Sequence, residues 1–397
     1  MGKVYLTPII QAASLKNKDE YGRPLMGWWR EGDYYRYGWS MITPHPCFNW
    51  KKIRERMEMP DSHKIVYDSG GYLMVVGNFS ATPHEVQEWY NQNLSENDVG
   101  MLLDYPPYAK VEDQSSNNRQ TWIKVGDEEF IECLRRTKKS AEAMVKSRRV
   151  KHLFYGIVHG DTFTRMERWY GEMKDLAVWD GWAYAPKATA TNPIALVKAL
   201  IFAHAHTREL PFHIFGITGN STLPVMVYAM KDFPGHMTVD STTYLQGAAS
   251  RHYMLMTGVR HNIRLTSEEV GRIELEELPC DCPICIGHTP DDLIGIGRPE
   301  NDPIPGNLIS MHNLVTMVKH IQILQCLRRD PESFAIYSGF VKTRQALDIW
   351  DYYIEHGYEA VKKRETVLGA AFVKGQRTLG EEYGTVDTPA AEMGLFD

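Results

Sequence analysis

The chain has 397 residues, of which 43% are hydrophobic and 24% charged, and its formal net charge is −6. This is the composition of a globular protein with a large core, and it excludes a disordered or fibrous chain. The charge carries no global signal for nucleic acid, whose binders usually have a basic face. No stretch reaches the roughly 18 apolar residues that a membrane helix needs, so we expect a soluble, cytoplasmic protein without membrane contacts.

From about residue 60 to 260, short apolar runs alternate with amphipathic stretches, which is the pattern of repeated βα units. The predicted strands are 64–67, 100–103, 152–158, 182–185, 213–217 and 236–239. One helix is predicted to start at Thr82, which can cap it, with Pro83 in the first turn and Glu85 bonding back to the cap. Another begins at Asn192-Pro193 and runs towards Thr207.

Polar side chains follow four of these strands closely: Asp68, Asp104, His159 and Asp240. Barrel enzymes place their chemistry at the carboxyl ends of the strands. No GxGxxG or Walker-type loop follows the first predicted strand, which disfavours the alternative, a doubly wound nucleotide-binding sheet. We therefore predict an α/β fold, a (β/α)8 TIM barrel, with an inserted zinc-binding subdomain.

The composition changes after about residue 265, where a stretch rich in Gly, Pro and Asp begins, and helical pattern resumes at 308–327. We expect the barrel with its catalytic strand ends in 1–265 and the zinc-binding subdomain with its helix in 266–330. Residues 331–397 are expected to add C-terminal helices and a tail that complete the barrel.

The zinc prediction rests on three cysteines within six positions, followed by a histidine: Cys280, Cys282, Cys285 and His312. Three thiolates and one imidazole make a closed tetrahedral set, which is typical of structural Zn²⁺. His288 is a competing fourth ligand, and a chance cluster of unliganded cysteines is the alternative without metal.

The segment Asp68-Ser69-Gly70-Gly71-Tyr72 directly follows an apolar run. Paired glycines let the backbone approach a flat ligand, and Tyr72 offers a ring for stacking. Taken singly, this segment could be a turn that caps a strand, His159-Gly160 a buried core histidine and its turn, and Asp240 a helix cap. Together they predict one site.

Two basic stretches, 134–139 and 146–151, are the best candidates for phosphate contacts. The solvated face of a long helix explains them equally well.

In order and in type, these motifs resemble those of the tRNA-guanine transglycosylase family. Residues 68–72 are similar to its DSGG-aromatic motif, 155–160 to its FGIVQGG, and the cysteines with His312-Asn313-Leu314 to its zinc motif and HNL helix. The resemblance covers roughly residues 60 to 330 and implies a zinc-bearing barrel that replaces guanine in a nucleic acid by a 7-substituted deazaguanine.

The resemblance also implies roles for the aspartates. Asp240 matches the nucleophile that forms a covalent glycosyl intermediate, Asp68 the carboxylate that handles protons, and Asp104 the one that reads the Watson–Crick edge of the base. Two carboxylates suit such chemistry, because one traps the positive charge on the sugar and the other, with a raised pKa, moves the proton. The substrate-binding residues expected beside them are Ser69, Gly70, Gly71, Tyr72, Asp104, His159 and Gly160.

The chain departs from the family at several points. The family has Gln where His159 stands, its glycine-rich strand end is replaced at 181–187, and the arginine-containing segment of the tRNA enzymes is replaced at 241–252. That loss of arginines, and a length that leaves no room for the extra RNA-binding domain of archaeal relatives, favour DNA over tRNA as the substrate. The branch that inserts 7-cyano-7-deazaguanine into DNA is therefore predicted, with tRNA as the alternative.

Other interpretations stay open. One is a catalytically inactive barrel that serves as a nucleic-acid-binding subunit, against which the three retained aspartates argue. Another is a hydrolytic N-glycosidase or glycoside hydrolase with the same two-carboxylate logic. A helper protein that opens DNA and a homodimer are left open as partners.

Overall fold

The computed structural model describes residues 2–10, 27–30, 35–44, 51–75, 77–112, 120–185, 192–216, 219, 221–255, 262–264, 278, 280–299, 302–330, 332–334 and 341–368. Eight parallel strands of this part close into a barrel in the order β1-β10-β9-β8-β7-β4-β3-β2. They are β1 (Lys3–Ile10), β2 (Trp39–Ile42), β3 (Lys64–Tyr67), β4 (Val99–Met101), β7 (Leu153–Val158), β8 (Gly181–Tyr184), β9 (Phe212–Ile214) and β10 (His236–Ser241). The predicted (β/α)8 fold is confirmed.

Each of the six predicted strands overlaps a barrel strand, whereas β1 and β2 were not predicted. β1 contains Pro8, and proline normally argues against a central strand because it lacks an N–H donor. Here Pro8 pairs with Ser241 near the carboxyl end of the strand. β2 has only four residues, all buried, too few for a periodic pattern to show.

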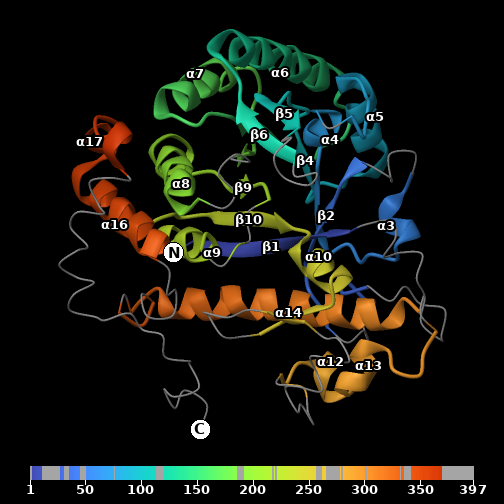
Figure 1. Ribbon diagram of the computed structural model, residues 1–397. Helices are drawn as coiled ribbons and strands as arrows, with labels where there is room; N and C mark the ends of the chain where they lie inside the picture. The colour runs from blue at the N-terminus through green and yellow to red at the C-terminus, as the bar shows by residue number, and fades with distance from the viewer. Residues whose placement is uncertain are drawn as a thin grey trace.

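Helices surround this barrel (Figure 1). Those between its strands are α3 (Ile53–Arg56), α4 (Gly71–Val75), α5 (Pro83–Asn93), α6 (Asp127–Ser147), α7 (Phe163–Met173), α8 (Pro193–Thr207) and α9 (Leu223–Ala229). The predicted starts of α5 and α8 are confirmed: Thr82 and Glu85 form a capping box, and the side chain of Asn192 caps α8.

After β10 the chain forms α10 (Thr243–Ala249), α12 (Pro283–Ile286), α13 (Pro290–Ile294), α14 (Ile304–Leu327), α16 (Val341–His356), α17 (Tyr358–Lys362) and the 3₁₀ turn η2 (Glu365–Val367). Two antiparallel pairs lie outside the barrel, β5 (Tyr108–Glu112) with β6 (Gln120–Lys124), and β11 (His252–Met254) with β12 (Asn262–Arg264).

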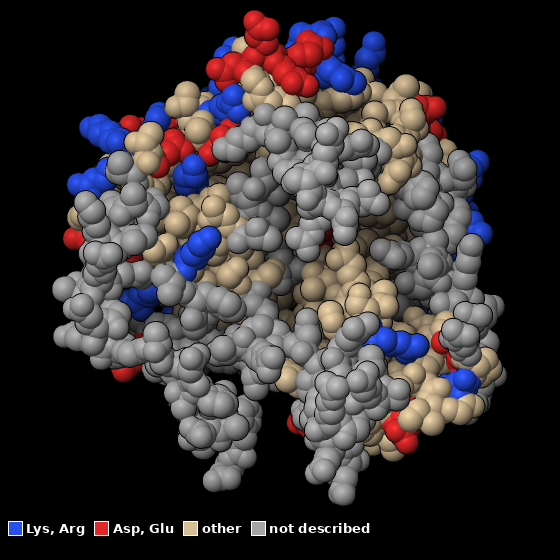
Figure 2. Space-filling view, in the orientation of Figure 1, with Lys and Arg blue, Asp and Glu red and all other residues tan. Residues whose placement is uncertain are grey.

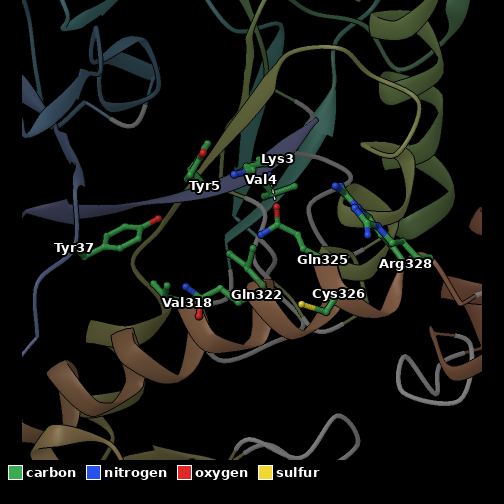
Figure 3. Close-up of a pocket in the computed structure, with 11 residues that line it drawn as sticks. Lys3, Val4, Tyr5, Tyr37, Val318, Gln322, Gln325, Cys326 and Arg328 are labelled. Carbon is green, nitrogen blue, oxygen red and sulfur yellow. Dashed lines mark hydrogen bonds between the residues drawn. The ribbon is translucent and has the colours of Figure 1, made fainter. Parts of the chain in front are cut away.

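Helix α14 is buried on nearly all sides, as expected for a helix with elements packed around it. It packs against β1, α9 and α10 on the barrel and against α12 and α13 beyond (Figure 1). A cavity between α14 and the start of β1 is lined by Lys3, Gln322 and Arg328, among others (Figure 3). Because Lys3 pairs with His236 and Thr7 with Asp240, this cavity lies at the amino end of β10, away from Asp240.

None of the described helices combines the length and the apolar character needed to span a bilayer.

Candidate active site

Three carboxylates gather at the carboxyl ends of the barrel strands. Asp68 follows β3, Asp104 lies three residues beyond β4, and Asp240 is the penultimate residue of β10. Both Asp104 and Asp240 are close enough to Asp68 to raise its pKa by charge repulsion. The fold thus brings together the three aspartates predicted as one site.

The carboxyl group of Asp68 has a raised pKa. Although part of the residue is exposed, loss of solvent around the carboxyl raises its pKa to about 7, with smaller contributions from the charges of Asp104 and Asp240. The backbone N–H of Gly70 donates to Asp68 Oδ1 at 3.3 Å, and this hydrogen bond lowers the pKa of Asp68. A carboxyl with a pKa near neutrality can both release and accept a proton at neutral pH.

The two glycines after Asp68 are required by close contacts. Gly70 has φ +83°, and a Cβ there would lie 2.7 Å from Pro44 Cγ. A Cβ on Gly71 would lie 2.2 Å from Asp104 Oδ1, so the missing side chain makes room for that carboxylate. Ser69 is buried and its Oγ accepts from the Gly71 N–H at 3.5 Å, while Tyr72 in α4 is 37% exposed.

Asp104 is buried and bonded to His159, which follows β7. His159 Nε2 lies 2.6 Å from Asp104 Oδ2, and because a carboxylate can only accept, Nε2 carries the proton. The imidazole has no exposed surface and packs edge-on against Trp169 at 4.8 Å. Its Nδ1 is buried without a hydrogen-bond partner in the described part of the chain. His159 is therefore connected to the site by its hydrogen bond to Asp104, and its own side chain is not exposed there.

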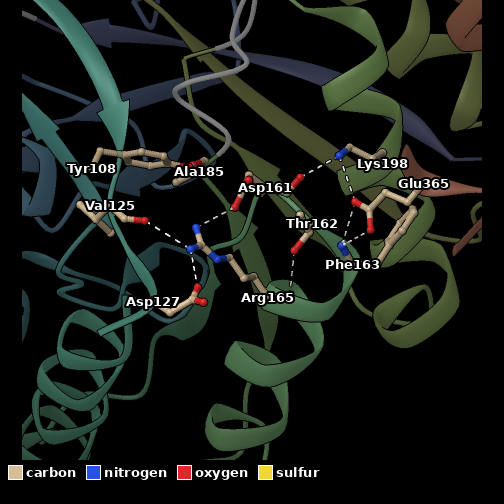
Figure 4. A network of polar contacts seen from close by, with 10 residues as sticks. All are labelled: Tyr108, Val125, Asp127, Asp161, Thr162, Phe163, Arg165, Ala185, Lys198 and Glu365. Atoms are coloured by element: carbon tan, nitrogen blue, oxygen red, sulfur yellow. Dashed lines mark hydrogen bonds and ion pairs between the residues drawn. The ribbon is translucent and has the colours of Figure 1, made fainter. Parts of the chain in front are cut away.

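The loop that carries His159 is anchored on both sides (Figure 4). Gly160 has φ +150°, and a Cβ there would lie 2.6 Å from the backbone nitrogen of Met166 in α7. Arg165 binds the carboxylates of Asp161 and Asp127, at 3.1 and 2.6 Å. Lys198 of α8 donates to the carbonyl oxygen of Asp161 at 2.7 Å. These contacts hold the turn after β7 against α6, α7 and α8.

Asp240 is held by two residues that the sequence analysis did not single out. The Gly216 N–H donates to Asp240 Oδ1 at 2.6 Å, and His213 Nε2 lies 3.2 Å from the same oxygen. Asp240 is 6% exposed and His213 is fully buried. A histidine at the first position of an otherwise apolar predicted strand was the available signal, but its partner lies 27 residues away on the next strand.

The predicted metal ligands form one cluster. Their ligand atoms, on Cys280, Cys282, Cys285 and His312, all lie within 4.8 Å of one another. His312 Nδ1 is 3.4 Å from Cys282 Sγ and 3.3 Å from Cys285 Sγ. His312 Nε2 lies 2.8 Å from the carbonyl oxygen of Met254, so it donates there and leaves the Nδ1 lone pair towards the thiols. This donor set can hold a metal ion.

His288, the competing ligand, is outside this cluster. Its Nδ1 lies 2.6 Å from the carbonyl oxygen of Ile284. Asn313, next to His312 on α14, donates to the carbonyl oxygens of His252 and Tyr244, and its Oδ1 accepts from the Met254 N–H. The metal cluster is thereby tied to the segment that follows Asp240.

The basic stretches 134–139 and 146–151 are largely paired. Arg135 contacts Glu132, Lys138 contacts Glu172 at 2.8 Å, and Arg149 contacts Glu88. Figure 2 shows acidic and basic side chains interspersed over α6. The pairing favours a solvated helix face for most of these residues.

Comparisons with known proteins agree with this geometry. No protein-family model matches the chain. It is 27% identical over 295 residues to a tRNA-guanine(15) transglycosylase of Methanocaldococcus jannaschii, covering 71% of this chain and 41% of the relative. It is 23% identical over 355 residues to that of Archaeoglobus fulgidus, covering 87% and 67%. These similarities support the tRNA-guanine transglycosylase superfamily.

A third relative, the tRNA-guanine(15) transglycosylase of Saccharolobus solfataricus, is 22% identical over 306 residues, 72% of this chain and 54% of the relative. The chain spans less than half the length of the first relatives, 41% and 37%. These three relatives are named for tRNA, and they give no specific support to the DNA-modifying branch expected from the sequence.

Proposed function

We propose that this protein exchanges a guanine in a nucleic acid for another base of the same class through a covalent intermediate on Asp240. The observation that carries this proposal is the pairing of two different carboxyl groups in one site. Asp240 has one oxygen held by two donors, and Asp68 has a pKa raised to about 7. One group is suited to bond formation with the sugar and the other to proton transfer.

The exchange takes two displacements. Asp240 attacks the anomeric carbon as the bond to the guanine nitrogen breaks, and protonated Asp68 gives its proton to the leaving base. The incoming base then attacks the same carbon, Asp68 takes its proton, and Asp240 leaves with its electron pair. Configuration at the sugar is retained, as in retaining glycosidases.

Asp104 is proposed to accept from the Watson–Crick edge of the base, with Gly71 making room for it and His159 orienting it. Ser69, Gly70 and Gly160 shape the backbone around the base, and the ring of Tyr72, which is 37% exposed, stacks on the base. We also propose that the metal is Zn²⁺ with a structural role, since its four protein donors leave no open position.

For the nucleic acid we propose tRNA, because the superfamily relatives are named for it. Exposed Arg136 lies 3.9 Å from the ring centre of Tyr105, next to Asp104, and could contact a phosphate there. DNA, with 7-cyano-7-deazaguanine as the incoming base, stays a second candidate. One observation favours it: helix α10, which follows Asp240, carries no basic residue.

The test is incorporation of labelled guanine into tRNA, single-stranded DNA and duplex DNA by wild-type protein and Asp240→Asn. We expect incorporation into tRNA, a denaturation-resistant adduct with wild type, and neither with the variant. Incorporation into DNA but not into tRNA would show that the substrate is DNA, the second candidate. Guanine release without any incoming base would indicate a hydrolase, and no turnover of any substrate would favour the inactive binding subunit.

A further inference from the structure

A histidine inside the barrel lies between two side chains of β10. In the register of β9 and β10, His213 is opposite Thr238, and Thr238 and Asp240 are two residues apart and so point to the same side of the strand. His213 Nδ1 lies 2.9 Å from Thr238 Oγ1, and its Nε2 lies 3.2 Å from Asp240 Oδ1. All three side chains are buried.

The chemistry of the acceptors sets the position of one proton. Because an ionised carboxylate only accepts, His213 must carry a proton on Nε2 and donate it to Asp240. In the neutral imidazole, Nδ1 then accepts from the Thr238 hydroxyl. The resulting chain of donors runs from Thr238 through His213 to Oδ1 of Asp240, which also accepts from the Gly216 N–H at 2.6 Å.

This arrangement makes the two oxygens of Asp240 different. Oδ1 has two donors, whereas no described residue bonds Oδ2. We propose that His213 is a positioning residue that directs Oδ2 to the anomeric carbon and, with Gly216, stabilises the charge that returns to Oδ1 when the covalent intermediate breaks down. The inference rests on the proposed function and adds a role for His213 to it.

The consequence for each half of the reaction follows from the charge on Oδ1. When the bond between Oδ2 and the sugar forms, Asp240 becomes an ester and Oδ1 loses most of its negative charge. When the incoming base displaces Asp240, the electron pair of the Oδ2–carbon bond returns to the carboxylate, and donors to Oδ1 stabilise that developing charge. Removal of the His213 donor should therefore slow breakdown more than formation.

We would measure the lifetime of the covalent adduct after addition of excess incoming base, for wild type, His213→Leu and His213→Gln. We expect His213→Leu to lengthen it by about tenfold or more, since loss of one such donor typically costs about a hundredfold in rate or more. His213→Gln, which keeps an N–H donor, should recover part of the loss. A role limited to folding would instead lower the amount of active protein and leave the adduct lifetime unchanged.

His63 provides a matched control. It is also a buried histidine bonded to a hydroxyl, with Nε2 2.8 Å from Ser40 Oγ, but it precedes β3 at the opposite end of the strand from Asp68. His63→Leu should leave the adduct lifetime unchanged.

The hydrogen bond can be tested without turnover by ¹⁵N NMR of labelled histidines, using His213→Gln to identify the signal. In wild type the His213 Nε2 should be protonated, and Asp240→Ala should change its shift and speed exchange of its proton, while the signal of His63 stays in place. An Nε2 of His213 without a proton in wild type, or an unaltered signal in Asp240→Ala, would overturn the inference.

The two proposals fail in different ways. One outcome is that wild type exchanges guanine, Asp240→Asn does not, and the adduct of His213→Leu breaks down at the wild-type rate. In that case only the proposed role of His213 is wrong. If wild type forms neither product nor adduct with tRNA or DNA, the proposed function fails, and the inference about breakdown fails with it.

Discussion

At the scale of single residues, the environment of Asp68 governs how the site should respond to pH. Folding raises its pKa from the ordinary value of 3.8 to about 7, mainly because the carboxyl loses solvent. In the proposed reaction, a carboxyl with this pKa can carry at neutral pH the proton that the departing base takes. The Gly70 N–H, which favours the ionised form, keeps the shift from being larger.

We predict that release of guanine from a saturating nucleic acid falls as pH rises through about 7, because the protonated form of Asp68 is lost. Asp68→Asn should be slower by about a hundredfold or more and should lack this decline. The measurement is the rate of adduct formation in a single turnover at a series of pH values. An unchanged decline in the variant would assign it to another group.

The same shift has a consequence for stability with a defined sign. Between about pH 4 and 7 the native state binds a proton on Asp68 that the unfolded chain has released, so the free energy of unfolding falls as pH rises through this window. Asp68→Asn should flatten that part of the pH profile relative to wild type, as measured by denaturant unfolding.

At the scale of elements, helix α14 connects the metal cluster to the barrel. One of its residues, His312, belongs to the cluster, and the next, Asn313, bonds the backbone of α10 and β11. Tyr253 of β11 stacks on His312 with ring centres 3.7 Å apart, and its hydroxyl lies 3.1 Å from Cys285 Sγ. A bound metal would hold α12, α14 and β11 together next to the chain that leaves Asp240.

We predict one tightly bound zinc per chain, lost in Cys282→Ser together with several kcal/mol of stability, because metal-binding free energy at such sites becomes folding free energy. Cys326→Ser is the control: Cys326 lies on α14, as His312 does, but it is exposed and outside the cluster. Metal analysis and thermal unfolding of the purified variants give the readout. Full stability and no metal in wild type would refute the prediction.

At the scale of the whole molecule, the C-terminal part of the described chain secures the catalytic end of the barrel. Glu365 of η2 accepts from the Phe163 N–H at the start of α7, at 3.1 and 3.2 Å, and from Lys198 of α8 at 3.0 Å (Figure 4). Because Lys198 also binds the carbonyl of Asp161, residues about 200 positions apart hold the turn after His159.

We predict that Glu365→Ala lowers the free energy of unfolding by about 2 kcal/mol, since it removes the acceptor of the Phe163 N–H and the ion-pair partner of Lys198, which keeps only the carbonyl oxygen of Asp161. It should also weaken binding of the nucleic acid by loosening the loop that carries His159. Glu359→Ala, an exposed position of the neighbouring helix α17, should change stability by less than about 0.5 kcal/mol. Equal stability of the two variants would contradict this account.

The sequence by itself determined the features whose cause is local. The sequence predicted six barrel strands, the starts of α5 and α8, and the members of the metal cluster. Apolar runs, capping residues and most of the ligand spacing involve residues that are close together in the sequence. The three aspartates were grouped correctly because parallel strands of a barrel bring their carboxyl ends to one face.

Tertiary structure alone decided the features that depend on distant neighbours. β1 and β2 are barrel strands because they pair with β10 and β3. In the sequence, the proline in β1 and the four-residue length of β2 hide the strand pattern. The contact of His213 with Asp240 and the close approach of Gly71 to Asp104 join adjacent strands and loops. Burial and hydrogen-bond partners are set by side chains that meet only when the barrel closes, so no local pattern carries them.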